Sequence, residues 1–219
     1  MKILYIPMDG NEKEKMYFCK SFLIDKRMKK ICVYCASSSK IDSSYVETAR
    51  KLGEIFAKNG IDLIYGGGSV GLMGTLADAV MNANGKVVGV IPRFMCDVEW
   101  HHKGISELIL TETMHERKQM MADLADAVVA LPGGCGTMEE LMEVITWKQL
   151  GIFNKPIVIL NANNYYDHLI AQLEHSVNEH FMIEKHKDIW SVVNCADAVL
   201  ESIENAKSWD ESARNFAKI

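Results

Sequence analysis

The chain has 219 residues, of which 48% are hydrophobic and 24% charged, an ordinary composition for a globular protein that buries one core. Its formal net charge of −5 argues against a nucleic-acid partner, and no apolar run reaches the roughly 18 residues of a membrane span. Residues 2–8 are too short for the apolar core of a secretory signal. We therefore expect a cytoplasmic protein with neither a nucleic-acid nor a membrane partner.

The start of the chain differs in pattern from the rest. Residues 1–27 mix short apolar pieces with charged ones, and regular periodicity begins only after Met28. We treat residues 1–27 as an N-terminal extension of unknown role and residues 28–219 as a single domain.

From Lys30 onward, short apolar runs alternate with amphipathic segments of helical period. The expected strands are residues 31–35, 61–65, 86–91, 107–111, 127–131, 156–160 and 189–193. The expected helices are residues 43–58, 71–84, 114–124, 138–150, 165–178 and 195–205. Apolar strands that alternate with helices predict an α/β fold, a doubly wound parallel sheet with helices on both faces.

One glycine cluster follows the strand expected at 61–65. Gly66, Gly68 and Gly71 satisfy the G-x-G-x-x-G pattern of a dinucleotide site, between a strand and a helix. That fingerprint also needs an acidic residue roughly 20 positions further on, and none lies between Asp78 and Asp97. NAD binding is therefore disfavoured. The chain has no G-x-x-x-x-G-K-[ST] sequence, so a P-loop nucleotidase is not supported either.

A second glycine cluster, Pro132-Gly-Gly-Cys-Gly-Thr-Met-Glu-Glu140, is more informative. It joins the strand expected at 127–131 to a helix expected to begin near Thr137. Glycines allow close approach of a ligand, and a helix N-terminus offers unpaired N–H groups, so the turn predicts an anion site. Thr137 and Glu140 also have the spacing of a capping box, which needs no ligand but would not require the glycines.

Two cations lie close to the start of the helix expected at 114–124. Thr113 and Glu116 have the spacing of a capping box, which places Arg117 and Lys118 in the first turns of the helix. The helix dipole disfavours cations there by roughly 0.3 to 1 kcal/mol each, so a functional task is indicated. Solvated surface charge is the alternative.

The helix expected at 138–150 has an apolar side and a mixed side. Met138, Leu141, Met142 and Ile145 share the side that we expect to face the core. Glu140 and Trp147 then lie on the opposite, exposed side. An exposed tryptophan fits an aromatic wall for a planar base, a contact with a partner subunit, or the edge of a neighbouring helix.

Cysteines and histidines give no metal signature. Cys32 and Cys35 lie on one expected strand, where an offset of three directs the thiols to opposite faces, so we expect two buried apolar residues. His101 and His102 occupy a loop, and no H-E-x-x-H sequence occurs. No metal site is predicted.

Several motifs together resemble the Lonely Guy family. They are residues 114–118 (MHERK), 132–140 (PGGCGTMEE), 65–74 (YGGGSVGLMG), 35–38 (CASS) and 146–151 (TWKQLG) followed by Asn154-Lys-Pro156, and the resemblance spans Met28 to the C-terminus. Members are cytokinin riboside 5′-monophosphate phosphoribohydrolases, often mislabelled lysine decarboxylases. The resemblance implies a Rossmann-like nucleotide-binding catalytic domain, a homodimer with the site near the interface, and no cofactor.

The resemblance also assigns residues. Arg117 and Glu140 match the catalytic pair. The substrate contacts that it implies are Lys118, Gly134, Cys135, Gly136, Thr137, Glu139 and Thr146. The implied reaction releases the base and ribose 5-phosphate from a nucleoside 5′-monophosphate, which is either AMP or an isoprenoid-modified nucleotide. A nucleotide-binding module without turnover is the main alternative. A pyridoxal-phosphate decarboxylase would need a Schiff-base lysine in the site, and we expect no apolar pocket around Lys118, the candidate for that role.

Overall fold

A seven-stranded parallel sheet organises residues 28–96, 100–210 and 212–213, which are the residues that the computed structural model describes. The strands are β1 Lys30–Tyr34, β2 Asp62–Tyr65, β3 Val87–Pro92, β4 Glu107–Thr111, β5 Ala127–Ala130, β6 Ile157–Leu160 and β7 Ser191–Val193. Their order is β4-β3-β2-β1-β5-β6-β7. All seven expected strands are confirmed, with ends shifted by two residues at most. The N-terminal extension, residues 1–27, lies outside the described residues.

Helices connect the strands. The α-helices are α2 Ser43–Lys58, α3 Gly71–Asn82, α4 Arg93–Cys96, α5 Met114–Leu124, α6 Cys135–Gln149, α7 Asp167–Asn178 and α8 Val199–Glu204. The 3₁₀ turns are η1 Ala162–Asn164, η2 Glu184–Asp188 and η3 Ala196–Ala198. The helix expected at 195–205 is thus a 3₁₀ turn followed by α8, and α4 was not expected. The expected start of α7 at residue 165 is two residues too early, because Tyr166, with φ −97° and ψ 9°, departs from helical geometry and precedes the first helical residue, Asp167.

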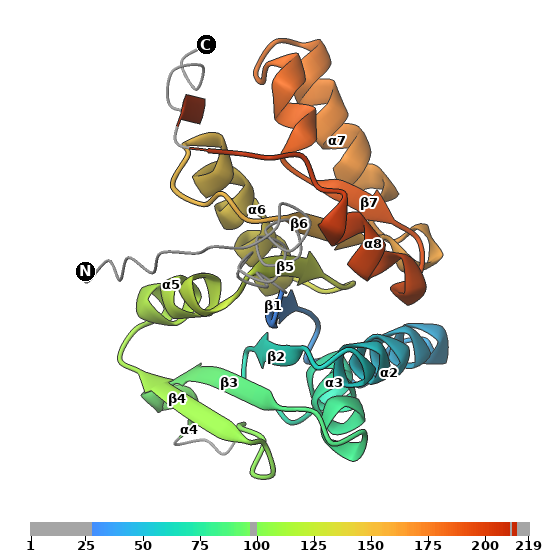
Figure 1. The fold of residues 1–219 in the computed structure, drawn as a ribbon, viewed down its shortest axis with the longest axis vertical. Coiled ribbons are helices and arrows are strands. Elements are labelled where there is room, and N and C mark those ends of the chain that lie inside the picture. The colour runs from blue at the N-terminus through green and yellow to red at the C-terminus, as the bar shows by residue number, and fades with distance from the viewer. Residues whose placement is uncertain (1–27, 97–99, 211, 214–219) are drawn as a thin grey trace, which may run out of the picture.

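The sheet is covered on both faces, as expected for a doubly wound fold. Ile31 and Val33 pack with α2 and α3 on one face, whereas Cys32 and Tyr34 pack with α5 and α6 on the other. Figure 1 shows these helix pairs on opposite sides of the strands. Cys32 and Cys35 belong to different core clusters and are free and buried, so the prediction for the two thiols is confirmed. Burial raises the pKa of both thiols.

The order of the strands reverses between β1 and β5. These two strands are neighbours, yet α2 follows β1 onto one face and α6 follows β5 onto the other. A crevice therefore opens at their carboxyl ends, which is where open α/β sheets bind ligands. The loop after β1 meets the turn after β5 there, because the N–H of Ala36 donates to the carbonyl of Pro132 at 3.3 Å.

Candidate active site

The glycine turn after β5 presents donors to the crevice, because its carbonyl groups already have partners. Four carbonyls in succession accept hydrogen bonds: Leu131 from Tyr166 Oη at 2.7 Å, Pro132 from Ala36 N at 3.3 Å, Gly133 from Tyr165 Oη at 2.7 Å and Gly134 from Met138 N at 3.0 Å. Helix α6 begins directly after Gly134, and no side chain caps it. The N–H groups of the first helical turn are therefore free to bind an anion.

The capping-box alternative for this turn is wrong. Helix α6 begins at Cys135 with Gly134 as its N-cap, so Thr137 already lies inside the helix. The side chain of Thr137 packs against Gly133, where a β-carbon would collide with it. Glu140 turns away from the helix start and binds Arg117. The side chains that were expected to cap the helix therefore do something else.

Among the described residues, no steric or backbone constraint requires glycine at two positions of the turn, Gly134 and Gly136. Gly134 has an ordinary φ of −81°, and Gly136 has no left-handed backbone. A β-carbon at either position would meet no atom within 4 Å. A glycine within a helix costs roughly 0.5 to 1 kcal/mol relative to alanine. Open space above both glycines is what close approach of a ligand would require.

A buried ion pair lies beside the turn. Arg117 Nη1 is 2.7 Å from Glu140 Oε1, and the two side chains are 7% and 10% exposed. Arg117 Nε also donates to the carbonyl of Val90 at 3.1 Å. A β-carbon on Gly66 would collide with the guanidinium, so this glycine makes room for Arg117. The alternative of solvated charges at Arg117 is wrong, and so is the expectation of an exposed Glu140.

Burial and the charge of Arg117 shift the pKa of Glu140 in opposite directions. Burial raises the pKa of the Glu140 carboxyl above its usual range, and the Arg117 guanidinium opposes that rise. The pair needs this partner, because an unpaired charge at such a depth is strongly destabilising. A carboxylate with low solvent access and a fixed orientation is suited to stabilising positive charge that develops on a substrate.

A second ion-pair group joins α5 to α6 nearer the surface. Lys118 Nζ lies 2.5 Å from Glu139 Oε1 and 3.1 Å from Glu143 Oε1, and the lysine side chain is 7% exposed. The alternative of a solvated Lys118 is therefore also wrong. Thr146 is exposed and binds the carbonyl of Met142 in its own helix. The structure places Thr146 further along α6 than the other predicted contacts.

The orientation predicted for α6 is confirmed for Leu141 and Ile145, which face the core, and wrong for Met142 and Glu140. Its buried residues are Thr137, Glu140, Leu141, Val144, Ile145 and Lys148, whereas Met142 is 37% exposed. Trp147 is only partly exposed and packs against the core cluster that contains Leu141. The edge-covering alternative for Trp147 is thus the one that fits.

Protein groups occupy part of the upstream glycine turn. At the start of α3, the N–H of Met73 donates to the carbonyl of Ala36 at 3.2 Å. Gly71, with a φ of +65°, has the backbone of Ser37 and Ser38 directly against it. Trp100 and His102 add backbone hydrogen bonds to Ser69 and Gly67 on the other side. These contacts hold the upstream turn in place with protein groups and add to the sequence argument against NAD binding.

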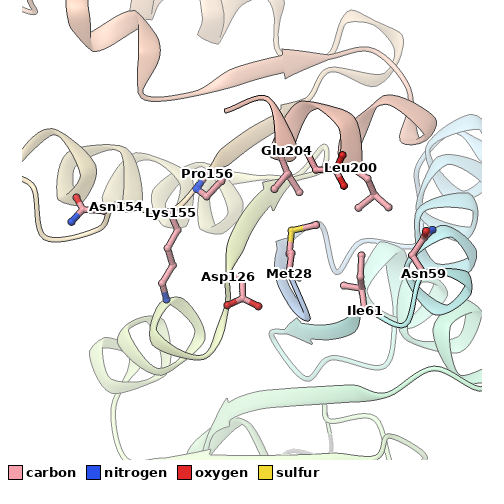
Figure 2. A pocket seen from close by; sticks show the side chains of 10 residues that line it. Met28, Asn59, Ile61, Asp126, Asn154, Lys155, Pro156, Leu200 and Glu204 are labelled. Carbon is pink, nitrogen blue, oxygen red and sulfur yellow. The ribbon is translucent and has the colours of Figure 1, made fainter. Parts of the chain in front are cut away.

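Two hollows differ in size and position. A cavity of about 130 Å³ lies beside the turn and is lined by Ala36, Ser38, Ile41, Tyr45, Leu72, Pro132, Gly133, Gly134 and Tyr165. A larger hollow of about 760 Å³ lies at the amino ends of the strands, among Met28, Asp126 and Pro156 (Figure 2). The larger hollow contains none of the predicted site residues. Because ligands of parallel sheets bind at carboxyl ends, the candidate site is the crevice at the turn.

No helix among the described residues is long and apolar enough to cross a membrane. No group of three or more histidine, cysteine, aspartate or glutamate side chains in the same residues is placed to hold a metal ion. His102 instead binds Asp78, with Nε2 3.0 Å from Oδ1.

Sequence reasoning missed Tyr165 and Tyr166, which bind two carbonyls of the turn. The available signal was the position of two aromatic residues just past the carboxyl end of a strand, where ligand-binding loops of such sheets lie. With the parallel sheet, these features define a Rossmann-like protein with an uncapped helix start after a glycine turn and a buried acid beside it.

Comparison with known proteins identifies the family. Residues 73–203 match a family model described as possible lysine decarboxylase. A probable cytokinin riboside 5′-monophosphate phosphoribohydrolase of Oryza sativa subsp. japonica is 43% identical over 178 residues, which are 81% of this chain and 78% of that protein. A cytokinin riboside 5′-monophosphate phosphoribohydrolase of Arabidopsis thaliana is 45% identical over 186 residues, 84% of this chain and 86% of the relative.

The chain therefore belongs to the cytokinin riboside 5′-monophosphate phosphoribohydrolase family, as its motifs predict, and it is a hydrolase of N-glycosyl bonds. Solved structures agree on the fold. The molybdenum cofactor binding protein of Rippkaea orientalis superposes with a TM-score of 0.63 at 20% identity, over 82% of this chain and 97% of that one. The Moco carrier protein of Chlamydomonas reinhardtii gives a TM-score of 0.62 at 20% identity, over 82% and 98%.

The charge state of Lys118 argues against a Schiff-base role for this lysine. A Schiff-base lysine must lose its proton, for which a lowered pKa is needed. Burial lowers the pKa of Lys118, but the hydrogen bonds that Lys118 donates to the carboxylates of Glu139 and Glu143 more than offset this, and the net shift of the pKa is upward. Lys118 is therefore held as an ammonium ion, which is the form that cannot attack a carbonyl.

Proposed function

We propose that this enzyme hydrolyses the N-glycosidic bond of adenine-type nucleoside 5′-monophosphates, either AMP or an isoprenoid-modified nucleotide, to the free base and ribose 5-phosphate. The observation that carries the proposal is that α6 supplies both a donor-only N-terminus and the buried Glu140. One rigid helix can thus hold a phosphate and place a carboxylate at a fixed distance from it.

The phosphate group would bind the turn. Gly134, Cys135, Gly136 and Thr137 offer backbone N–H groups, and the positive end of the helix dipole favours a dianion there. The carbonyls of Gly133 and Gly134 accept hydrogen bonds from Tyr165 Oη and Met138 N, and so do not repel the ligand. Lys118, Glu139 and Thr146 would contact the nucleotide further along α5 and α6.

The bond cleavage would use Glu140. As the base departs with the bonding electron pair, C1′ acquires positive charge, and a carboxylate held nearby stabilises it. Water adds to C1′, and the proton that it loses balances the proton gained by the leaving base. Arg117 would keep Glu140 ionised and oriented, since its guanidinium opposes the effect of burial on the pKa of that carboxyl. The reaction needs no cofactor.

A second copy of the chain is proposed to cover α5 and α6. Both helices expose apolar side chains, and more follow α6. These residues are Met114, Met120, Met142, Leu150 and Ile152. Exposed apolar side chains on two neighbouring helices fit a homodimer contact close to the site, with a second copy of the chain as the partner. Light scattering after size exclusion should give a dimer for the wild-type chain and a monomer for Met142→Glu.

Chromatography of the products tests the activity directly. The enzyme would be incubated with AMP, isopentenyladenosine monophosphate or adenosine. Free base should appear from at least one nucleotide and at a far lower rate from adenosine, because remote phosphate binding helps to place the sugar. Tight nucleotide binding without release of base would favour the binding-module alternative. Equal rates with adenosine and AMP would remove the phosphate role of the turn.

A further inference from the structure

Tyr165 holds the glycine turn from the side of the small cavity. Its hydroxyl donates to the carbonyl of Gly133 at 2.7 Å, and its ring is 42% exposed in the wall of that cavity. We infer that Tyr165 is a positioning residue for the phosphate site, which orients the N–H group of Gly134 toward the ligand. This inference rests on the proposed function and adds to it a residue outside the motifs.

The geometry of the peptide bond connects the hydrogen bond of Tyr165 to the direction of the Gly134 N–H group. A trans peptide is planar, so the carbonyl of Gly133 and the N–H of Gly134 point in opposite directions. A hydrogen bond from Tyr165 to that carbonyl therefore directs the following N–H away from the tyrosine. Without the hydroxyl, the peptide between two glycines could rotate, since glycine tolerates most backbone angles. A carbonyl turned into the site would then face the anion.

The tyrosine is itself held firmly. Tyr45 and Tyr166 contact its ring edge-on, with ring centroids 5.9 Å and 4.9 Å away. Its loop contains Asn163 and Asn164 in left-handed conformations. Asn163 Nδ2 donates to Ser44 Oγ at 2.6 Å, which ties the loop to α2. Such backbone conformations persist only when their surroundings hold them, and they gather at functional sites.

Tyr166 provides a matched control in the same turn. Its hydroxyl donates to the carbonyl of Leu131, also at 2.7 Å. The next residue is Pro132, which has no N–H group to orient. Loss of the Tyr166 hydroxyl should therefore affect stability alone, and more strongly, because Tyr166 is only 1% exposed.

The test compares Tyr165→Phe with Tyr166→Phe, which remove one hydroxyl each and keep the rings. Calorimetry would give the Kd of ribose 5-phosphate and AMP, and kinetics would give kcat and KM. Tyr165→Phe should weaken both ligands about 2- to 10-fold, raise KM by a similar factor and change kcat little. Tyr166→Phe should lower Tm and leave both Kd values unchanged. Adenosine binding should be the same in all three proteins.

The outcomes separate this inference from the proposed function. Wild-type affinity for both phosphate ligands in Tyr165→Phe overturns the positioning role, as does equal weakening in Tyr166→Phe. A parallel loss of adenosine affinity also overturns it, because it would place Tyr165 against the base or sugar. If the wild-type chain binds AMP without releasing adenine, the proposed function fails while the Kd comparison still decides the role of Tyr165. If it binds neither phosphate ligand, both fail.

Discussion

Replacing Arg117 by methionine tests whether the Arg117–Glu140 pair is structural, catalytic or both. Methionine has a similar length and fills the space without a charge. The change leaves Glu140, 10% exposed at its side chain, without its cation. Removal of one partner from a buried ion pair costs about 3 to 5 kcal/mol. In a domain of this size, that loss lowers Tm by roughly 6 to 20 °C.

The stability that Arg117→Met loses should be larger at pH 7 than at pH 4. Burial already raises the pKa of Glu140, and without Arg117 the pKa rises further. Above about pH 4.3, the unfolded carboxyl has lost its proton while the folded one keeps it. Stability of the variant therefore falls as pH rises from there through the folded pKa. Below about pH 4, both states hold a neutral carboxyl, and the stranded-charge part of the loss disappears.

Chemical unfolding of wild type, Arg117→Met and the double variant Arg117→Met/Glu140→Gln at pH 4 and pH 7 makes the comparison. The double variant contains no stranded charge, so it should regain most of the stability at pH 7 and still release no base. A difference below about 0.5 kcal/mol between Arg117→Met and wild type at pH 7 would refute the reasoning, since only surface substitutions are so mild. A large loss of equal size at both pH values would refute the charge argument alone.

Three other changes follow from the structure. Gly136→Ala should stabilise the protein by roughly 0.5 to 1 kcal/mol in urea unfolding, because its methyl group meets open space in a helix, and yet raise KM for the nucleotide. Glu140→Gln should lower the rate of base release by on the order of 100-fold or more in the chromatographic assay, and it should also lower stability, because it leaves the buried Arg117 without its anion. Burial lowers the pKa of Lys148 from 10.5 to about 8, so the folded protein loses this proton before the unfolded one. The stability of wild type relative to Lys148→Met should therefore rise by up to about 3 kcal/mol between pH 8 and pH 10.5, and a constant difference would contradict the assigned pKa.

The fold could be predicted because its signals are local. Runs such as Ile157–Leu160 are apolar throughout and fit only a strand that is buried on both faces. The glycine turn could also be predicted, since three glycines between a strand and a helix are typical of a loop that a ligand approaches closely. Where the observed ends of elements differ from the predicted ones, single residues set the observed ends. Helix α3, for example, ends at Asn82, and Asn84 follows with a positive φ of 59°.

The partners of Arg117 could not be predicted from the sequence. The position of Arg117 in its helix indicated only that a cation lies near the helix N-terminus, where the helix dipole disfavours one. The two groups that hold it, the carbonyl of Val90 and the carboxylate of Glu140, are 27 and 23 residues away along the chain. Contacts of this kind depend on how β3, α5 and α6 meet in space. The same holds for Tyr165 and the turn that it supports.

The prediction of which α6 residues are buried was partly wrong for a physical reason. An amphipathic interpretation turns the most apolar side of a helix toward the core. Here the buried side contains Thr137, Glu140 and Lys148 at regular helical spacing among Leu141, Val144 and Ile145. Each polar residue on that side has a specific contact: Thr137 packs on Gly133, Glu140 binds Arg117, and Lys148 Nζ donates to the carbonyl of Lys155 at 3.0 Å. Polar side chains at buried positions cost stability unless they are paired, so a helix that carries them is shaped by its site as well as by its core.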